Sequence, residues 1–416
     1  MDNTKQKVEV LAPVGSFESL RAAIAGGAHA VYFGVEQLNM RARSSINFTL
    51  EDLREIAQIA RENNVRTYIT INTILYDHDI RLMHKIVDTA KESGIDAIIA
   101  MDHAAIMYAN KAGMPVHIST QVNVTNLETV RFYAAFADVM VLSRELTLQQ
   151  VEAICKGVVK EQIKGPSGNL VKIETFVHGA LCMAVSGKCY LSLHTMNSSA
   201  NRGACKQNCR RTYTVKDEEG NELLIDNEYI MSPKDLNTID FLDKILDAGV
   251  SVLKIEGRSK GPDYVHDTTS CYREALELWY QGIIPDQAKK DEWTQRLAGV
   301  YNRGFWGGYF LGKKLGEWTD ADGSKASKLN QYVGKGNKYF AKVGVAEFEM
   351  KKDTLAVGDE IMITGPSIGM HRMTVPNLRL ENGQEVQQVK KGDVFSMPVD
   401  TKIRPSDKLF KVVDRE

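Results

Sequence analysis

Four of the six cysteines of this chain lie close together, in the segments FVHGALCMAVSGKCYLS and NRGACKQNC. They are Cys182, Cys189, Cys205 and Cys209, and their spacing is C-x6-C-x15-C-x3-C. Thiolates are soft ligands, and four that converge on one point suit an iron–sulfur cluster or a zinc ion. The spacing matches neither the paired C-x2-C of a zinc ribbon nor a ferredoxin run. Buried free thiols are the alternative interpretation.

The rest of the sequence favours a site that stays reduced. No apolar run is long enough to cross a membrane, and the first residues, MDNTKQKVEV, lack the apolar core of a signal peptide. We therefore expect a cytoplasmic protein with no membrane partner, in which cysteines remain thiols. The formal net charge of −1 argues against binding of polyanions through bulk positive charge, although a local basic face is compatible with it.

The cysteine stretch interrupts a regular alternation of strands and helices. Short runs of branched apolar residues predict strands at 8–12, 30–34, 66–72, 96–101, 116–120, 138–142, 172–178 and 252–256. Helical patterns follow most of them, at 16–25, 50–62, 79–93, 104–111, 127–136, 147–156 and 240–248. Eight such alternations predict an α/β fold, a TIM-like (β/α)8 barrel. A doubly wound open sheet is the alternative, but the phosphate-binding G-x-G-x-x-G is missing after the first strand.

We expect the chain to divide into three parts. Residues 1–285 form the (β/α)8-like catalytic domain, with a cysteine-bearing insertion, residues 179–235, between strands seven and eight. Barrel enzymes hold their active sites at the carboxyl ends of the strands, so the insertion would place the cysteines beside the substrate pocket. Residues 286–330 predict a helical, glycine-rich bridge. Residues 331–416 change to short strands separated by turns, which predicts a small β-barrel.

Polar side chains follow most of the predicted strands. In a barrel they would project into one pocket, where arginines suit a substrate with carboxylates or phosphates. Ordinary loop polars or salt bridges are the alternative for any one of them. The set is Asn39, Arg41, Arg43, Asn72, Gln121, Asn123, Arg144, Glu145, His178, Glu256 and Arg258.

The histidines give little support to a protease centre. His178 precedes Cys182 by four residues, and it could bind a metal, move a proton or hydrogen-bond a buried backbone group. His194 is the only other histidine near the cysteines, and the chain has neither a G-x-S-x-G elbow nor an H-E-x-x-H helix. Cys155 and Cys271 fall on predicted helices, and we interpret both as core thiols.

Basic side chains surround the cysteines, which suggests contacts with a phosphate backbone; a solvated loop is the alternative. These residues are Lys188, Arg202, Lys206, Arg210 and Arg211. The β-rich tail adds further cations and aromatic rings that could stack on bases. They are Lys335, Lys338, Lys342, Tyr332, Tyr339 and Phe340.

Taken together, these segments resemble peptidase family U32, whose members are often labelled collagenase-like proteases. The resemblance extends over nearly the whole chain and rests on LAPVGSFESLRAAIAGGAHAVYFG, STQVNVTN, FVHGALCMAVSGKCYLS, NRGACKQNCR, MSPKDL, LKIEGRSK and YNRGFWGGYF. Within the family, the chain is most similar to the tRNA hydroxylation proteins. The resemblance implies a (β/α)8-like domain with an iron–sulfur cluster, of the 4Fe-4S type, and a small C-terminal β-barrel. It also implies oxygen-independent hydroxylation of wobble uridine in tRNA to 5-hydroxyuridine, with prephenate as the hydroxyl donor.

The family pattern also implies roles for particular residues. Cys182, Cys189 and Cys205 fall on its cysteine motif, and Cys209 is the fourth ligand by proximity. Some relatives carry a cysteine where this chain has Asn237, so either Cys209 replaces that ligand or the cluster keeps an open iron. We expect the small dicarboxylate donor to bind Arg41, Arg43, Arg144 and Arg258, with Glu145 beside them, and the reacting groups to be oriented by Asn72, Gln121, Asn123, His178 and Glu256.

Two other functions are compatible with the sequence. A metal-dependent U32 peptidase would cleave peptide bonds and lose that activity with a chelator. A non-catalytic RNA-binding protein with a structural zinc would bind RNA independently of the arginines at the strand ends. Barrels rarely carry such polar constellations without chemistry, which favours an enzyme.

Overall fold

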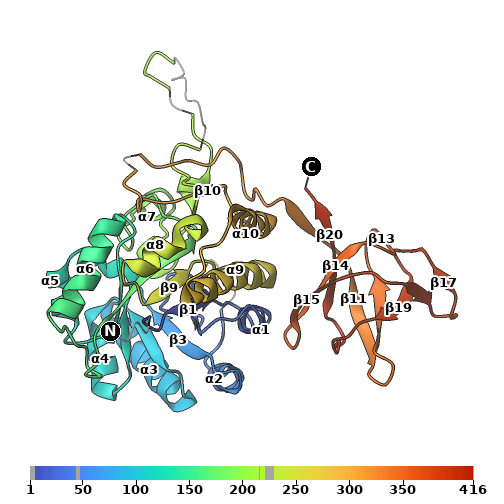
Figure 1. Cartoon of the computed structure of the whole chain (residues 1–416), viewed down its shortest axis with the longest axis horizontal. Coiled ribbons are helices and arrows are strands. Elements are labelled where there is room, and N and C mark those ends of the chain that lie inside the picture. The colour runs from blue at the N-terminus through green and yellow to red at the C-terminus, as the bar shows by residue number, and fades with distance from the viewer. Residues whose placement is uncertain (1–4, 44–46, 215, 221–228, 314, 416) are drawn as a thin grey trace.

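The computed structural model describes residues 5–43, 47–214, 216–220, 229–313 and 315–415. Its larger part is a closed parallel barrel (Figure 1). The eight strands of the wall are β1 (Glu9–Pro13), β2 (Ala30–Phe33), β3 (Arg66–Ile71), β4 (Ala97–Ala100), β5 (Val116–Ile118), β6 (Val139–Val141), β7 (Lys172–Gly179) and β9 (Val252–Ile255). Strand β9 pairs in parallel with both β1 and β7, and this closes the ring. The predicted (β/α)8 barrel is therefore confirmed.

Helices cover the outside of the barrel between successive strands (Figure 1). They are α1 (Phe17–Ala25), α2 (Leu53–Glu62), α3 (Ile80–Ser93), α4 (His103–Ala112), α5 (Leu127–Tyr133), α6 (Leu148–Lys160), α8 (Leu242–Asp247) and α9 (Pro262–Gln281). Local signals set their limits. The Thr147 side chain caps α6 in a capping box with Gln150, and Gly94 ends α3 with a left-handed backbone, φ 82°.

Two layers of apolar side chains hold the barrel together. The larger core lies between the strands and the helices, and it contains residues such as Phe33, Ile69 and Met83. A smaller buried cluster, which includes Leu11, Tyr68 and other residues of alternate strand positions, fills the barrel interior. Side chains of a strand alternate between its two faces, so both layers are built from the same strands.

The predicted insertion between β7 and β9 forms loops above the carboxyl end of the barrel. It contains the short helix α7 (Leu191–Met196), and it leads into β8 (Asp235–Asn237), which pairs antiparallel with the end of β7. Strand β10 (Phe305–Trp306) then pairs with β8, so the bridge after the barrel returns to the cysteine loops. Residues 215 and 221–228 of the insertion lie outside the described part of the chain.

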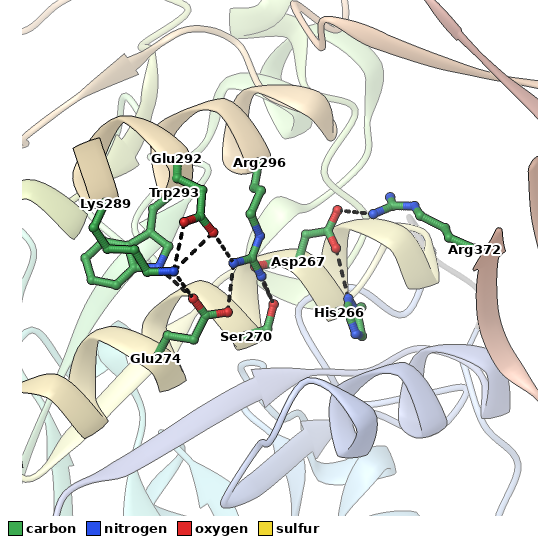
Figure 2. Close-up of polar contacts among 9 residues, drawn as sticks. All are labelled: His266, Asp267, Ser270, Glu274, Lys289, Glu292, Trp293, Arg296 and Arg372. Carbon is green, nitrogen blue, oxygen red and sulfur yellow. Dashed lines mark hydrogen bonds and ion pairs between the residues drawn. The ribbon is translucent and has the colours of Figure 1, made fainter. Parts of the chain in front are cut away.

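Helix α10 (Gln287–Gly299) packs against α9 through a network of charged side chains (Figure 2). Glu274 of α9 lies at its centre: its carboxylate is 2.7 Å from Arg296 Nη1, 3.0 Å from Lys289 Nζ, and accepts from the Trp293 indole at 2.9 Å. The buried Trp293 ring anchors α10, and the ion pairs fix its orientation on α9.

The C-terminal part of the chain is an antiparallel sheet, which confirms the predicted change of architecture. Its strands run in the order β15 (Gly369–Thr374), β14 (Glu360–Gly365), β20 (Lys408–Asp414), β11 (Lys328–Phe340), β12 (Val345–Met350), β19 (Val394–Pro398), β16 (Leu378–Leu380) and β17 (Glu385–Val386). Two short strands, β13 (Thr354–Ala356) and β18 (Gln388–Lys390), pair separately. Strand β11 crosses the predicted boundary at residue 330, and the three-part division stays a prediction.

The sheet packs on the side of the barrel formed by α1 and α9 (Figure 1). Arg372 of β15 lies 2.7 Å from the buried carboxylate of Asp267 in α9, which also contacts His266 (Figure 2). Arg21 of α1 donates to the backbone oxygen of Pro366 at 2.7 Å. In the hairpin between β14 and β15, Gly369 comes so close to α1 that a Cβ there would lie 3.1 Å from the Ala22 nitrogen. Among the described residues no helix is long and apolar enough to span a bilayer.

Candidate active site

One cavity, of about 260 Å³, lies at the carboxyl ends of the barrel strands. All four clustered cysteines line it, and we call it the cysteine cavity. Six of the predicted strand-end residues line it as well, and they come from the ends of different strands. They are Arg41, Asn72, Gln121, Arg144, Glu256 and Arg258. The fold thus brings the cysteines and most of the predicted polar set to one place.

The cysteine loops are held to one another by hydrogen bonds within the insertion. Asn201 Oδ1 accepts from the Cys189 backbone nitrogen at 3.3 Å, and Cys205 Sγ accepts from the Gln207 nitrogen at 3.4 Å. Arg210 donates to the backbone oxygens of Pro233, at 2.7 Å, and Leu181. These bonds fix the loops that carry the thiols, so the thiols are presented to the cavity in a defined arrangement.

The four clustered cysteines are thiols that line the cysteine cavity. All six cysteines of the chain are free thiols, and Cys182 is exposed whereas the other three of the cluster are half-buried. Burial raises the pKa of Cys209, Arg210 lowers it, and the charges of the other three cluster cysteines raise it further. In the described part of the chain no three His, Cys, Asp or Glu side chains are close enough to hold one metal ion.

An ion pair crosses the barrel end beside the cysteines. Arg41 Nη2, in the loop after β2, lies 2.7 Å from Glu256 Oε1, directly after β9. Burial alone would raise the pKa of Glu256, but Arg41, Lys260 and Arg144 outweigh it and hold this pKa at about 2. Glu256 also keeps the pKa of Arg41 above its ordinary value. Both groups are therefore charged at neutral pH.

Arg258 is a buried cation of the same cavity. Its Nη1 donates to Thr70 Oγ1 at 2.7 Å and to Asn39 Oδ1 at 3.1 Å. Burial lowers the pKa of Arg258 to about 10, which still leaves it protonated at neutral pH. Asn39, predicted as a cavity residue, thus acts in the described structure as the support of Arg258.

Sequence reasoning missed three further cations that line the cavity, Lys254, Lys260 and Arg303. Lys254 Nζ is buried on β9, 2.6 Å from the buried Glu174 Oε1 of β7. Burial, with a contribution from Arg303, lowers the pKa of Lys260 to about 8. A signal was available: a lysine within the apolar run VLKIE is expensive to bury and commonly functional.

Amide and hydroxyl groups form the remaining wall. Asn72 Nδ2 lies 3.3 Å from both Ser119 Oγ and Gln121 Oε1, and Asn72 Oδ1 accepts from the Met40 nitrogen at 3.2 Å. These bonds fix the side chains of Asn72 and Gln121 at the strand ends, where they were predicted to lie. Their catalytic role stays a prediction.

Four members of the predicted set lie elsewhere. His178 is buried outside the lining of the cysteine cavity, 3.4 Å from Tyr272 Oη, and burial lowers its pKa to about 3, so it is neutral. Arg43 is exposed and also outside that lining. Asn123 and Glu145 line a neighbouring cavity instead. Asn237, the position where we expect some relatives to carry a cysteine, accepts from Tyr272 Oη at 3.3 Å and lies outside the described lining of the cysteine cavity.

The predicted RNA-binding residues divide into two groups. Lys188, Lys206 and Arg211 are exposed and available to phosphates. Arg202 pairs with Asp79 and lies over the Tyr76 ring, and Arg210 holds the cysteine loop as described above. The exposed group therefore remains the better candidate for a nucleic-acid contact.

Comparison with known proteins places this site in a family. The sequence profile of peptidase family U32 matches residues 15–320. The chain belongs to peptidase family U32. A protein named collagenase from Porphyromonas gingivalis is 56% identical over 409 residues, which is 98% of each chain. The tRNA hydroxylation protein P1 of Bacillus subtilis is 29% identical over 98% of this chain and 95% of its own. The tRNA hydroxylation protein P of Helicobacter pylori is 34% identical over 73% of this chain and 72% of its own.

Proposed function

We propose that this U32 protein is a tRNA-modifying enzyme that hydroxylates wobble uridine to 5-hydroxyuridine, with prephenate as hydroxyl donor and no molecular oxygen. The observation that carries the proposal is the cysteine cavity, where four thiols and an excess of cations meet at the catalytic end of a barrel. Two relatives named for tRNA hydroxylation support it, and one of them aligns with almost the whole chain.

Cys182, Cys189, Cys205 and Cys209 would hold an iron–sulfur cluster. The donor set fits, because four soft thiolates converge and the cations Arg41 and Arg210 offset their charge. When bound, such a cluster supplies electron transfer or a Lewis-acidic iron.

The cations of the cavity would bind the carboxylates of the donor. Arg41 is already paired with Glu256, and Lys254 with Glu174, so Arg144, Arg258 and Lys260 provide the uncompensated positive charge. Arg144 is positioned for this by a 2.9 Å bond to the Ala180 oxygen and by the Phe176 ring beneath it. A dicarboxylate fits such a set because guanidinium forks bind carboxylates in a bidentate manner.

A metal-dependent peptidase is the second candidate, favoured by the collagenase-named relative at 56% identity. The cavity offers it little. No histidine is present among the described residues that line the cysteine cavity. Glu256, with a pKa of about 2, is a weak general base near neutral pH.

The deciding experiment compares tRNA from a strain that lacks the gene with tRNA from the same strain carrying it on a plasmid. We expect mass spectrometry of the nucleosides to show loss and recovery of 5-hydroxyuridine derivatives. Unchanged tRNA would refute the proposal. Collagen cleavage by the pure protein, abolished by a chelator, would establish the peptidase instead.

A further inference from the structure

A second cavity, of about 390 Å³, adjoins the cysteine cavity. The segment 181–186, which includes Cys182, lines both, as do Thr120 and Arg144. The two spaces therefore adjoin along a segment that carries a cysteine of the cluster. A group bound in the second cavity would lie close to whatever is bound in the first.

Three aromatic side chains form one side of this second space, which we call the aromatic cavity. Trp306, Tyr309 and Trp318 converge on Gly316: a Cβ there would lie 3.8 Å from Trp306 Cη2, 3.5 Å from Tyr309 Oη and 4.0 Å from Trp318 Cη2. The Trp306 and Tyr309 rings also pack edge to face, with centroids 5.2 Å apart. Glycine at position 316 leaves open the space that any side chain would fill.

Backbone pairing fixes these rings in place. Trp306 lies in β10, beside β8, and its indole donates to the Lys234 oxygen at 3.1 Å. Trp318 forms an isolated bridge with Pro233, and the Thr319 nitrogen donates to the Ser232 oxygen at 2.8 Å. The aromatic side of the cavity is thus preformed, as ligand sites usually are.

Polar side chains from the ends of the barrel strands line the same cavity as the three aromatic rings. The Asn123 side-chain amide donates to the backbone oxygens of Gln121, at 2.8 Å, and Ser186, at 3.0 Å. Its side-chain carbonyl oxygen is the atom that could accept from a ligand. Thr120 is 5% exposed, and its hydroxyl has no hydrogen-bond partner among the described residues. Glu145 adds a carboxylate, which accepts from Ser143 Oγ at 3.2 Å. A buried hydroxyl without a partner costs free energy unless a ligand or water satisfies it.

We propose that the aromatic cavity binds the target base of the RNA after it is flipped out of its stack. This inference rests on the proposed function and assigns its RNA subsite. Enzymes that modify a base extrude it into a pocket where aromatic rings stack on it and polar groups meet its edge. Asn123, Thr120 and Glu145 provide the edge partners, and the three rings provide the stacking surface. The base and the carboxylate donor then meet along the segment 181–186, which lines both cavities.

A proline-rich peptide is the competing occupant, since aromatic grooves also bind proline. The polar side of the cavity favours a base. A proline ring has no hydrogen-bonding edge, and it would leave the Thr120 hydroxyl and the Asn123 carbonyl unsatisfied.

Photocross-linking tests the assignment. A hairpin RNA carrying one 5-iodouridine in its loop is irradiated with the purified protein, and the linked peptide is mapped by mass spectrometry. We expect the link on Tyr309 or Trp318, and no link when the 5-iodouridine is in the paired stem. A link to the C-terminal sheet, or to a residue that lines the cysteine cavity alone, would overturn the assignment. Free 5-iodouridine linked as efficiently as the hairpin would show a nucleoside site rather than an RNA site and would also overturn it.

Variants give an independent measurement. Trp318→Ala and Tyr309→Ala should each raise the KM for RNA by roughly 5- to 150-fold, the range for loss of one stacking aromatic, with the iron content unchanged. Gly316→Leu removes no ring, and by filling the cavity it should have the same effect. Phe132→Ala, which removes an exposed ring on α5, is the matched control and should behave as wild type.

The two proposals fail in different ways. If the wild-type protein hydroxylates tRNA and the three variants match it within about twofold, the subsite is wrong and the function stands. If the gene makes no difference to tRNA, both are wrong. If instead the variants lose cleavage of a proline-rich peptide that the wild type cleaves, the cavity is a peptide site and the RNA assignment is wrong.

Discussion

Arg41 and Glu256 approach each other to 2.7 Å from opposite sides of β1, one after β2 and the other after β9. Their pair spans the carboxyl end of β1 and lines the cysteine cavity. The pKa of Glu256 is about 2, so its carboxylate is ionised near neutral pH and keeps its ion pair with Arg41.

Replacement of Arg41 by methionine tests its role in donor binding. Arg41→Met leaves the Glu256 carboxylate in the cavity without its partner, where it repels the anionic donor, and we expect the KM for prephenate to rise by roughly 10- to 150-fold. Arg54→Met, which alters an exposed arginine on α2, is the matched control. Equal KM values for the two variants in steady-state hydroxylation assays would show that the Arg41–Glu256 pair has no role in donor binding.

The cysteines should determine the metal content. We expect Cys182→Ala and Cys209→Ser proteins, purified without oxygen, to lose most of their iron and acid-labile sulfide, because each removes one ligand. Cys155→Ala, which alters a buried thiol of α6, should keep both. Zinc in place of iron in the wild type, measured by elemental analysis, would contradict the cluster.

Loss of the positive charge of Lys260 should weaken donor binding in alkaline solution. Burial lowers its pKa to about 8, so the ammonium is present below that pH and is lost above it. We expect the KM for prephenate to rise above about pH 8, and Lys260→Arg to remove this rise, because a guanidinium stays protonated. An identical alkaline limb in both proteins would assign it to another group.

The buried pair Lys254–Glu174 should be sensitive to loss of one partner only. Glu174→Leu leaves an ammonium buried without its carboxylate, and we expect a loss of about 3–5 kcal/mol in the free energy of unfolding. Glu174→Leu combined with Lys254→Met should recover much of it, since no charge then remains buried. Urea denaturation of the two variants measures the difference.

Arg372 should fasten the C-terminal sheet to α9. Burial raises the pKa of Asp267, but His266 and Arg372 outweigh it and lower the pKa below its usual 3.8. The contact therefore contributes above pH 3.8 and is lost only in more acidic solution. We expect Arg372→Met to cost about 1–2 kcal/mol and to speed hydrogen exchange at the α9 contact, whereas Arg379→Met, far along the sheet, should not.

The sequence predicted the barrel strands to within a few residues, because buried parallel strands are continuous apolar runs between glycine-terminated helices. It also predicted Arg41, Glu256 and Arg258 in one cavity, since strand ends converge in any barrel. The position of His178 was predicted wrongly, because the alternation of side chains along a strand does not reveal an irregularity in strand pairing. Phe176 lines the cysteine cavity, and a regular strand would turn His178 to the same face, but the register between them shifts where β7 pairs with β9.

The aromatic cavity was beyond prediction for another reason. Trp306 and Tyr309 were visible in a glycine-rich bridge, but their approach to Asn123 depends on the pairing of β10 with β8, two strands that β9, α9 and α10 separate in the chain. Such pairing of distant segments follows from tertiary packing rather than from any local pattern.

The C-terminal sheet lies on the flank of the barrel at α1 and α9 (Figure 1), whereas the cysteines line the cavity at the carboxyl end of the barrel. A molecule that touches both must extend around the rim, which a free nucleoside is too short to do. The length of the RNA would therefore help to decide which molecules are bound as substrates. An RNA held at the flank would present only those nucleotides that lie one fixed span away, and the same base in a shorter molecule would arrive without that anchor.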